Sequence, residues 1–560
     1  MTEFTHDPIT LEILSNALRS VADETFVALR KSAFSNNIKE RADHSTALFD
    51  AKGRLIVQSQ QSLPIHVGGI AGTIRVLLEK FGDDIHEGDV FVGNDPYVAA
   101  GTHLPDICIS TPVFHEGKLF GFSACTAHHA DIGGASVGGS AGGLTEIYQE
   151  GLRIPLIRLF RRGELVSDVF EILLLNVRGA DERKGDYNAQ VAAAKLGAVR
   201  MIDICNRFGR DFTESALDEL LSRTRLRMQK ALTAIPEGDY HFEDVIDDDG
   251  MGTKDLPIKV CISLRCGQLT VDFEGTSEQA LGNMNSPFND TIATVLFVFR
   301  SILDPEISVN YGLFDAINVV APLGSLLNPT FPAGVTNRSL TDQRVCDVLL
   351  GALAQALPGQ MPAASNGSNT GVYVYGTDPR TGKSYYFFET MGGGLGGRTT
   401  KDGKDAVQFG VTNTANSPIE AIERDFPLLV EEYAIAEDTG GAGRFRGGCG
   451  IRRVVRPLAE CTFGGIGERF NHHPWGVSGG TQAATGFFAI RDADGTERRL
   501  PNKIPKVAVS ADQRIVMQTP GGGGLGSPSE RAPEAVEEDR QSGKFSESYI
   551  HLHYGERQNY

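Results

Sequence analysis

Two histidines and an aspartate lie in one short stretch whose pattern can bring their side chains together. His103 and Asp106 are three residues apart in GTHLPD, and His128 follows Asp106 by 22 residues in TAHHADIGG. The residues between Asp106 and His128 form two runs of strand-forming residues around the Gly-containing turn 115–118, which predicts a β-hairpin. Pairing on this hairpin places Asp106 almost opposite Ala127, next to His128. We therefore expect the two imidazoles and the carboxylate to converge.

Two histidines with one or two carboxylates form a ligand set suited to zinc, manganese or iron. The set contains no thiolate, which would mark a closed structural zinc site. A simpler interpretation is that His103 and His128 are ordinary residues at the end of a hairpin, bonded to the backbone. Because three ligand-type residues meet at one predicted end, we favour a metal site.

Two further candidates come earlier in the chain. Runs 45–49 and 54–58 predict a second hairpin, with Asp43 at its open end, where composition alone favours a plain turn residue. His66 opens a stretch that predicts a helix over residues 67–81. A helix N-terminus offers unpaired N–H groups that can hold an anion, so His66 is a candidate for supporting a ligand or the substrate, with helix capping as the alternative.

The residues just after His128 also carry chemistry. His129 and Asp131 could orient the last ligand or move protons, because a metal-bound imidazole usually donates its other N–H to an acceptor. The segment 133–144 is too rich in glycine to pack as a regular element. We interpret it as a loop lining the site, with a disordered surface loop as the alternative.

The elements that must position these residues follow from the periodicity of the chain. Residues 8–29 predict an amphipathic helix, and helical patterns return between 167 and 236, where we expect a helix bundle. Strand-like alternation and Gly-rich turns dominate after residue 238. The predicted fold is mixed α+β with several subdomains. We divide it into an α+β metal-site region (1–165), a helical region (166–237), a β-rich mixed α/β region (238–530) and a charged, partly disordered tail (531–560).

Composition restricts the class of protein. The chain has 560 residues, 53 Lys plus Arg and 71 Asp plus Glu, for a formal net charge of −18. This acidic balance argues against nucleic acid as a partner, because no basic excess is available to displace counterions. The N-terminus does not have the pattern of a signal peptide, and the sequence has no apolar run long enough to predict a membrane segment. The eight scattered cysteines are typical of reduced thiols. We expect a cytoplasmic protein.

Gly-rich segments near the C-terminus do not predict a nucleotide site. MGGGLGG and TPGGGGLG lack a following GKS or GKT, and neither lies between a predicted strand and helix. Any ATP chemistry would therefore belong to another chain.

The combination of DPITLEIL, RADHSTALFD, PIHVGG, GTHLPD, TAHHADIGG, DTGGAGRFRGGCG and TPGGGGLG resembles the hydantoinase B/5-oxoprolinase family. Relatives in that family include N-methylhydantoinase, caprolactamase and the acetone carboxylases. The matching segments extend from about residue 7 to residue 526, which is nearly the whole chain.

The resemblance implies a set of site residues, cofactors and partners. It places a fourth metal ligand at Asp43, beside His103, Asp106 and His128, for one divalent ion, manganese or zinc, with iron as the other choice. It also implies an A-type partner subunit that uses ATP and Mg to phosphorylate a cyclic amide, in an α2β2 or larger hetero-oligomer. The B-type chain would then open the ring of a small molecule such as a hydantoin, 5-oxoproline or another lactam.

Three alternatives stay open at this point. The metal could serve an acetone- or acetophenone-type ATP-dependent carboxylase, since both reactions would use the same ligands and an ATP-using partner. The chain could also be a metallohydrolase that needs no ATP. A noncatalytic scaffold subunit is the third alternative.

Overall fold

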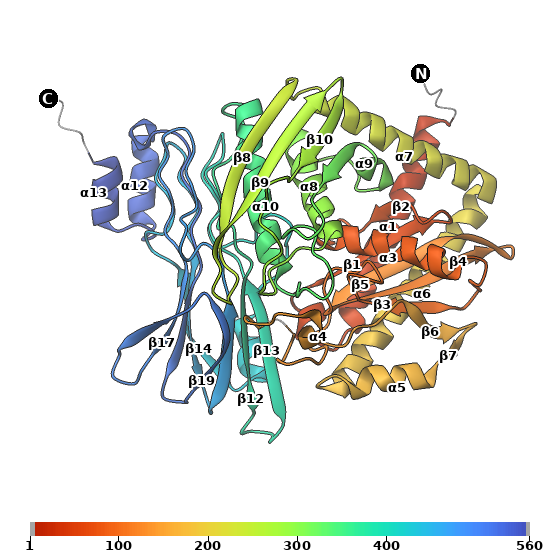
Figure 1. Cartoon of the computed structure of the whole chain (residues 1–560), viewed down its shortest axis with the longest axis horizontal. Coiled ribbons are helices and arrows are strands. Elements are labelled where there is room, and N and C mark those ends of the chain that lie inside the picture. Colours follow the sequence, from red (N-terminus) through yellow and green to blue (C-terminus); the bar gives the residue numbers. More distant parts are fainter. Residues whose placement is uncertain (1–5, 140, 556–560) are drawn as a thin grey trace.

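The computed structural model describes residues 6–139 and 141–555 and confirms the mixed α+β class (Figure 1). The N-terminal part lies on one side of the molecule, the C-terminal part on the other, and strands β8, β9 and β10 stand between them in the view of Figure 1. No helix in the described part of the chain is long and apolar enough to cross a membrane.

The N-terminal half is built on a seven-stranded sheet with the order β2-β1-β5-β4-β3-β6-β7. Each neighbouring pair in this sheet is antiparallel, so strands from the two predicted hairpins alternate in direction. The strands are β1 (His44–Asp50), β2 (Leu55–Gln58), β3 (Val90–Gly93), β4 (Asp106–His115), β5 (Lys118–His128), β6 (Ile157–Arg161) and β7 (Glu164–Leu165).

Helices cover both faces of this sheet because its strands carry apolar side chains on both sides. Helix α3 packs on one face against Phe49 and Phe122, while α1 and α6 pack on the other against Leu48 and Ile107. We expected the helices between residues 167 and 236 to pack as a bundle. The longest of them, α6, instead packs on the sheet. The helices are α1 (Pro8–Ser32), α2 (Asn36–Lys39), α3 (His66–Phe81), α4 (Ile147–Glu150), α5 (Ser167–Leu175), α6 (Ala180–Phe208) and α7 (Arg210–Leu232).

The β4–β5 hairpin differs by one register step from the sequence-based expectation. Its turn residues Glu116 and Gly117 both have positive φ, of 52° and 74°, as a tight two-residue turn requires. The register then shifts between Val113 and Phe114, where β5 carries one extra residue, Phe120, so that Asp106 lies directly opposite His128. Strand β1 pairs with the other edge of β5, and the backbone N–H of His128 donates to the carbonyl of Asp43 at 3.0 Å. The ends of three neighbouring strands therefore meet.

A four-stranded sheet and two long helices form the middle of the chain. The sheet has the order β11-β10-β9-β8, and its inner face packs on α8 and α10 in the largest apolar core. The elements are β8 (Gly238–Asp248), β9 (Lys254–Arg265), β10 (Gln268–Asp272), α8 (Phe288–Leu303), α9 (Tyr311–Phe314), β11 (Ile317–Val320) and α10 (Arg338–Ala356).

Two further sheets, with orders β13-β12-β16-β19 and β14-β15-β20-β17-β18, make up the C-terminal part and share one apolar core. Their elements are β12 (Thr370–Thr377), β13 (Ser384–Met391), α11 (Ile419–Asp425), β14 (Leu428–Ile435), β15 (Ile451–Pro457), β16 (Cys461–Ile466), β17 (Phe487–Arg491), β18 (Glu497–Leu500), β19 (Lys503–Val509) and β20 (Arg514–Gln518).

The glycine-rich segment 521–526 lies in the interior of the protein. Successive N–H groups of residues 521–526 donate to different neighbouring segments: 521 and 524 to the 481–484 segment, and 522 and 525 to the 445–448 segment. Only glycine permits such close approach, since a Cβ at Gly522 would lie 2.1 Å from the carbonyl oxygen of Leu395. These N–H groups are therefore already hydrogen-bonded to backbone carbonyl oxygens.

The tail was expected to be partly disordered, and this is wrong for its described residues. It forms η1 (Pro528–Glu530), α12 (Pro533–Gln541) and α13 (Glu547–Tyr554). Arg531 pairs with Asp402 and Asp539 pairs with Arg446, each at 2.8 Å, and Phe545 and Ile550 pack on Cys449. The charges that suggested disorder therefore hold the tail to the body of the protein. Residues 556–560 lie outside the described part.

Candidate metal centre

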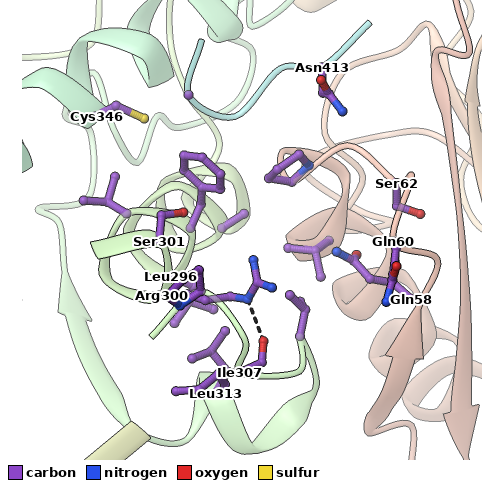
Figure 2. Close-up of a pocket in the computed structure, with 18 of the residues that line it drawn as sticks. Gln58, Gln60, Ser62, Leu296, Arg300, Ser301, Ile307, Leu313, Cys346 and Asn413 are labelled. Atoms are coloured by element: carbon purple, nitrogen blue, oxygen red, sulfur yellow. Dashed lines mark hydrogen bonds between the residues drawn. The ribbon is translucent and has the colours of Figure 1, made fainter. Parts of the chain in front are cut away.

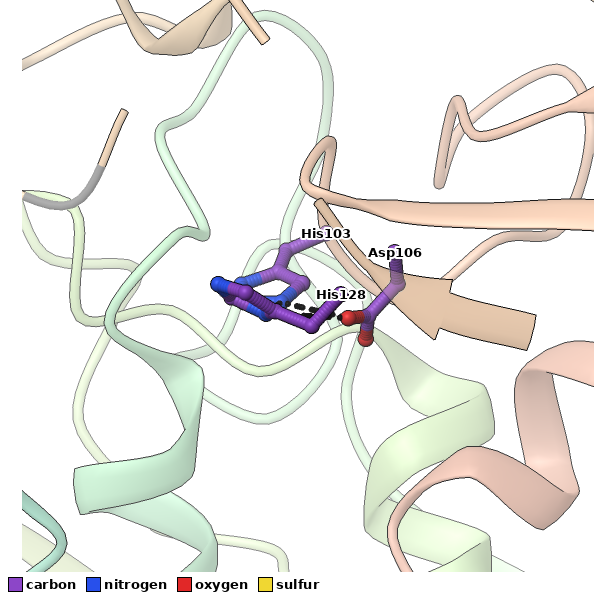
Figure 3. A group of neighbouring side chains, drawn as sticks. All are labelled: His103, Asp106 and His128. Carbon is purple, nitrogen blue, oxygen red and sulfur yellow. Dashed lines mark hydrogen bonds and ion pairs between the residues drawn. The ribbon is translucent and has the colours of Figure 1, made fainter. Parts of the chain in front are cut away.

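His103, Asp106 and His128 bring three donor atoms together at the end of the β4–β5 hairpin (Figure 3). His103 Nε2 lies 3.1 Å from Asp106 Oδ1 and 3.2 Å from His128 Nδ1, and His128 Nδ1 lies 3.1 Å from the same carboxylate oxygen. All three side chains are buried. Donor atoms about 3 Å apart suit ligands bound at about 2.0–2.2 Å from one ion. The triangle therefore has the dimensions of a metal-binding face.

Surrounding hydrogen bonds hold two of these donors in the form that a metal needs. His103 Nδ1 lies 2.9 Å from the carbonyl oxygen of Thr336 and donates to it, which leaves the lone pair of Nε2 directed at the cluster. The other carboxylate oxygen of Asp106 accepts from Thr102 Oγ1 at 2.6 Å and from Arg338 Nη2 at 2.9 Å. Asp106 Oδ1 is thereby left for the cluster, so the donor set fits one divalent ion.

The charge states agree with this arrangement. Burial lowers the pKa of His103 to about 4, and the guanidinium of Arg338 acts in the same direction, so its imidazole is neutral near pH 7. Burial opposes ionisation of Asp106, but the imidazoles of His103 and His66 outweigh it and its pKa lies well below the ordinary value. A neutral imidazole and an ionised carboxylate are the forms that bind metals.

Asp43 and His66 line the same cavity, but neither belongs to the cluster of three converging donors. Ser45 Oγ accepts from the N–H of Leu63 at 3.0 Å and lies 2.9 Å from His66 Nδ1, where either group can be the donor. His66 Nε2 lies 3.5 Å from Asp106 Oδ2 and 3.9 Å from Asp43 Oδ1. His66 is therefore a cavity residue placed between two carboxylates.

His129 and Asp131 face away from the described cavity lining. Neighbouring residues along an extended chain point to opposite sides, so His128 enters the cavity while His129 packs on Tyr187 and bonds Gln190 Oε1 at 2.8 Å. Asp131 accepts from the N–H groups of Gly133 and Gly138 and pairs with Arg178 at 3.0 Å. It anchors the Gly-rich loop 133–144 and does not contact the donors.

Much of the remaining cavity lining comes from residues that the sequence did not identify. Local pattern gives no signal for them because they reach the site from distant elements. The aromatic ring of Phe388 stacks on His128 with centroids 5.4 Å apart. The described lining also includes Thr336, Asn337, Arg338, Ser339, Asn369, Thr390, Thr412 and Thr414, around a cavity of about 50 Å³.

A larger cavity of about 710 Å³ lies next to this site and shares Thr412 with it. Figure 2 shows Gln58 and Gln60 on one side and Leu296 and Arg300 on the other. The Arg300 guanidinium points into the space while its Nε donates to the carbonyl of Ile307 at 2.6 Å. A molecule as large as a substituted ring can therefore lie beside the small cavity.

Comparison with known proteins gives a consistent result over the whole chain. The sequence model of the Hydantoinase B/oxoprolinase family matches residues 7–528. The B-type chain of a candidate D-/L-hydantoinase from Pseudomonas sp. (strain NS671) is 35% identical, over 98% of this chain and 95% of its own length. The β chain of caprolactamase from Pseudomonas jessenii is 32% identical, over 98% and 96% of the two chains.

Solved structures show the same relationship. The crystal structure of ATP-dependent caprolactamase from Pseudomonas jessenii matches with a TM-score of 0.92 and 30% identity, covering 99% of this chain and 96% of that one. A nucleotide-free structure of acetone carboxylase matches with a TM-score of 0.90 at 20% identity, covering 98% and 80% of the chains. The second likeness shows a common fold.

Proposed function

The chain belongs to the hydantoinase B/oxoprolinase family, and we propose that it is the metal-bearing subunit of an ATP-dependent enzyme that opens a cyclic amide ring. The observation that carries the proposal is the triangle of donor atoms from His103, Asp106 and His128, with Asp106 Oδ2 and His103 Nδ1 already bonded elsewhere.

These three residues would hold one divalent ion, manganese or zinc, with Asp43, the residue just before β1, as the fourth ligand. Such an ion lowers the pKa of a bound water and polarises a carbonyl or phosphoryl oxygen. Thr102 and Arg338 keep Asp106 in one orientation, and Phe388 keeps the ring plane of His128. The protein therefore supplies a preorganised donor set.

His66 is the residue we assign to proton transfer. Its Nε2 faces the carboxylates of Asp106 and Asp43, which favour a proton on that nitrogen, and the Ser45 hydroxyl can donate to Nδ1 in this tautomer. A ring nitrogen that becomes an amine on C–N cleavage needs one proton, which His66 can give and later recover from water.

Unstrained amides resist attack by water, so an activating step is needed before the ring opens. We assign that step, phosphorylation by ATP with Mg, to an A-type partner subunit in a hetero-oligomer. The Gly-rich segments of this chain support the assignment. The N–H groups of Gly394, Gly397 and Gly522 donate to backbone carbonyls in the interior, so they are not free to cradle phosphates.

Metal analysis tests the site directly. We expect purified Asp106→Ala and His128→Ala to lose the ion that the unaltered chain retains. His129→Ala is the matched control, because this adjacent histidine bonds Gln190 outside the cavity and should leave the metal content unchanged. Full occupancy in the first two variants would remove the site, and metal-free wild-type protein would revive a scaffold role.

Activity is tested by producing the chain together with its A-type partner. We expect ATP-dependent ring opening on a panel of hydantoins, 5-oxoproline and caprolactam with manganese or zinc, and little turnover by either chain alone. Acetone and acetophenone complete the panel. Bicarbonate-dependent consumption of a ketone without ring opening would favour the carboxylase alternative.

A further inference from the structure

Arg41 begins the RADHSTALFD segment and carries a fully buried guanidinium close to the metal cavity. It lies in the turn between α2 and β1. The next residue, Ala42, has a φ of 53°, in the left-handed region that residues with a side chain seldom adopt. This turn brings Arg41 Nη2 to 3.9 Å from Asp43 Oδ2. An uncommon backbone conformation therefore separates two charged side chains that lie next to each other.

Arg41 contacts three residues that line the metal cavity, although it is not itself among the described lining residues. Besides its approach to Asp43, its Nη2 donates to Thr390 Oγ1 at 2.7 Å. Its guanidinium carbon lies 5.1 Å from the centre of the Phe388 ring, a distance at which the aromatic face attracts a cation. Asp43 precedes β1, whereas Thr390 and Phe388 belong to β13. Arg41 therefore joins the N-terminal and C-terminal sides of the cavity.

Asp43 supplies the nearest negative charge to Arg41. It is the single carboxylate within 4 Å of this guanidinium in the described part of the chain. Glu389 also acts on Arg41 through space, but it is bonded to Arg453. Hydrogen bonds alone do not account for the buried position, because Arg41 Nε has no partner among the described residues. A buried charge needs an opposite charge close by, and Asp43 meets this need for Arg41.

The carboxylate of Asp43 in turn depends on charged neighbours for its position. None of the described residues donates a hydrogen bond to it. Its Oδ2 lies 3.9 Å from Arg41 Nη2, and its Oδ1 lies 3.9 Å from His66 Nε2. Asp106, by contrast, accepts two direct hydrogen bonds, at 2.6 and 2.9 Å. The attraction between Arg41 and Oδ2 is therefore a main restraint on the rotation of the Asp43 carboxylate.

We propose, resting on the assignment of Asp43 as the fourth metal ligand, that Arg41 is a positioning residue for this ligand. Its charge holds Asp43 Oδ2 and so orients the carboxylate for the ion. Its contacts with Thr390 and Phe388 hold the guanidinium against β13. The C-terminal part of the chain thereby helps to set the position of a ligand that the N-terminal part supplies.

Metal titration of the isolated chain, followed by calorimetry with manganese and with zinc, tests this role without a partner or turnover. We expect Arg41→Met, which removes the charge but keeps an unbranched side chain, to bind the ion about 10–100-fold more weakly than wild type. Arg41→Lys retains a positive charge and should bind more tightly than Arg41→Met. In an Asp43→Asn background, Arg41→Met should have little further effect, because Arg41 acts through that carboxylate.

Arg344→Met is the matched control for the loss of a buried guanidinium. Arg344 is also fully buried, and it pairs with Asp244 and Glu468 at 3.3 and 3.2 Å, outside the described lining of the metal cavity. We expect both Arg344→Met and Arg41→Met to lower the melting temperature of the metal-free protein. Arg344→Met should leave the metal affinity unchanged.

Three results would overturn the role of Arg41: wild-type metal affinity in Arg41→Met, an equal loss in Arg41→Lys and Arg41→Met, or an equal loss from Arg41→Met with and without Asp43→Asn. Each of them leaves the ring-opening function intact as long as Asp106→Ala and His128→Ala lose the ion. Retention of the ion by those two variants is the separate result that would remove the metal site itself.

Discussion

Arg338 is the residue whose removal should reveal most about the site, because it joins Asp106 of the proposed metal site to the second half of the chain. Arg338→Met deletes a buried guanidinium that is bonded to Asp106 and Asp290. Breaking a buried pair by removing one partner costs about 3–5 kcal/mol, since the remaining charge loses its compensation. With an unfolding entropy of about 2.1 cal/mol/K per residue, a chain of 560 residues that unfolds as a unit should melt about 3–4 °C lower.

Calorimetry on metal-free protein measures this shift without interference from the ion. Arg200→Met is the matched control, because Arg200 makes a comparable two-bond pair with Glu24 on the surface, where both side chains are 43% exposed. An exposed pair contributes about 0–1 kcal/mol, so the control should melt within about 1 °C of wild type. Metal titration gives a second readout. Loss of the partner that orients Asp106 should weaken binding about 10–100-fold.

Arg338 would neither stabilise the fold nor orient Asp106 if Arg338→Met had the same melting temperature as Arg200→Met and bound metal as tightly as wild type. Asp106 would then orient itself without Arg338. A melting shift without a change in metal affinity would refute the orienting role and leave the buried ion pair as a structural feature.

Three further predictions concern the surroundings of the site. Burial raises the pKa of Glu150 to about 7, although the N–H groups of Thr336 and Val335 oppose this. The stability that Glu150 contributes is therefore full below about pH 4.5 and is lost as pH rises through 7. Thermal unfolding followed between pH 4.5 and 8 should show that Glu150→Gln removes a loss of stability of about 3 kcal/mol over this range. Gly522→Ala should cost about 3 kcal/mol or more, because its Cβ would overlap a carbonyl, and a melting temperature equal to wild type would contradict the close packing. Phe388→Ala should leave metal content unchanged in the purified protein but lower turnover with the partner, since it frees the ring of His128 to rotate.

Local pattern predicted the hairpins and the donor set because both depend on residues that are close in sequence. Alternation with period two, together with the turn near Gly117, determines which residues of β4 and β5 share a face. The same periodicity should have separated His129 from His128, and we grouped them only by adjacency. The bulge at Val113 has no comparable signal. It moved the partner of Asp106 by one residue, onto His128 itself.

Packing that depends on distant segments was not predictable in this way. We assigned no structure to the Gly-rich segment 521–526 beyond excluding a nucleotide site, and it lies in the interior because segments far apart in the chain supply its hydrogen-bond partners. The tail suggested disorder from its charges, yet Asp539 pairs with Arg446 in a buried contact. Composition predicted neither arrangement because it does not show which distant residues a segment will meet.

The three metal-donor residues and much of the remaining cavity lining come from different parts of the chain, and this division affects substrate range. All three converging donors precede residue 130 and depend on one sheet, whereas Ser339, Asn369 and Phe388 reach the cavity from α10, from the residue before β12, and from β13. Changes in this lining can therefore alter which ring is accepted without disturbing the donor atoms. Relatives named for different rings would then keep one metal centre and differ in the rest of the cavity lining.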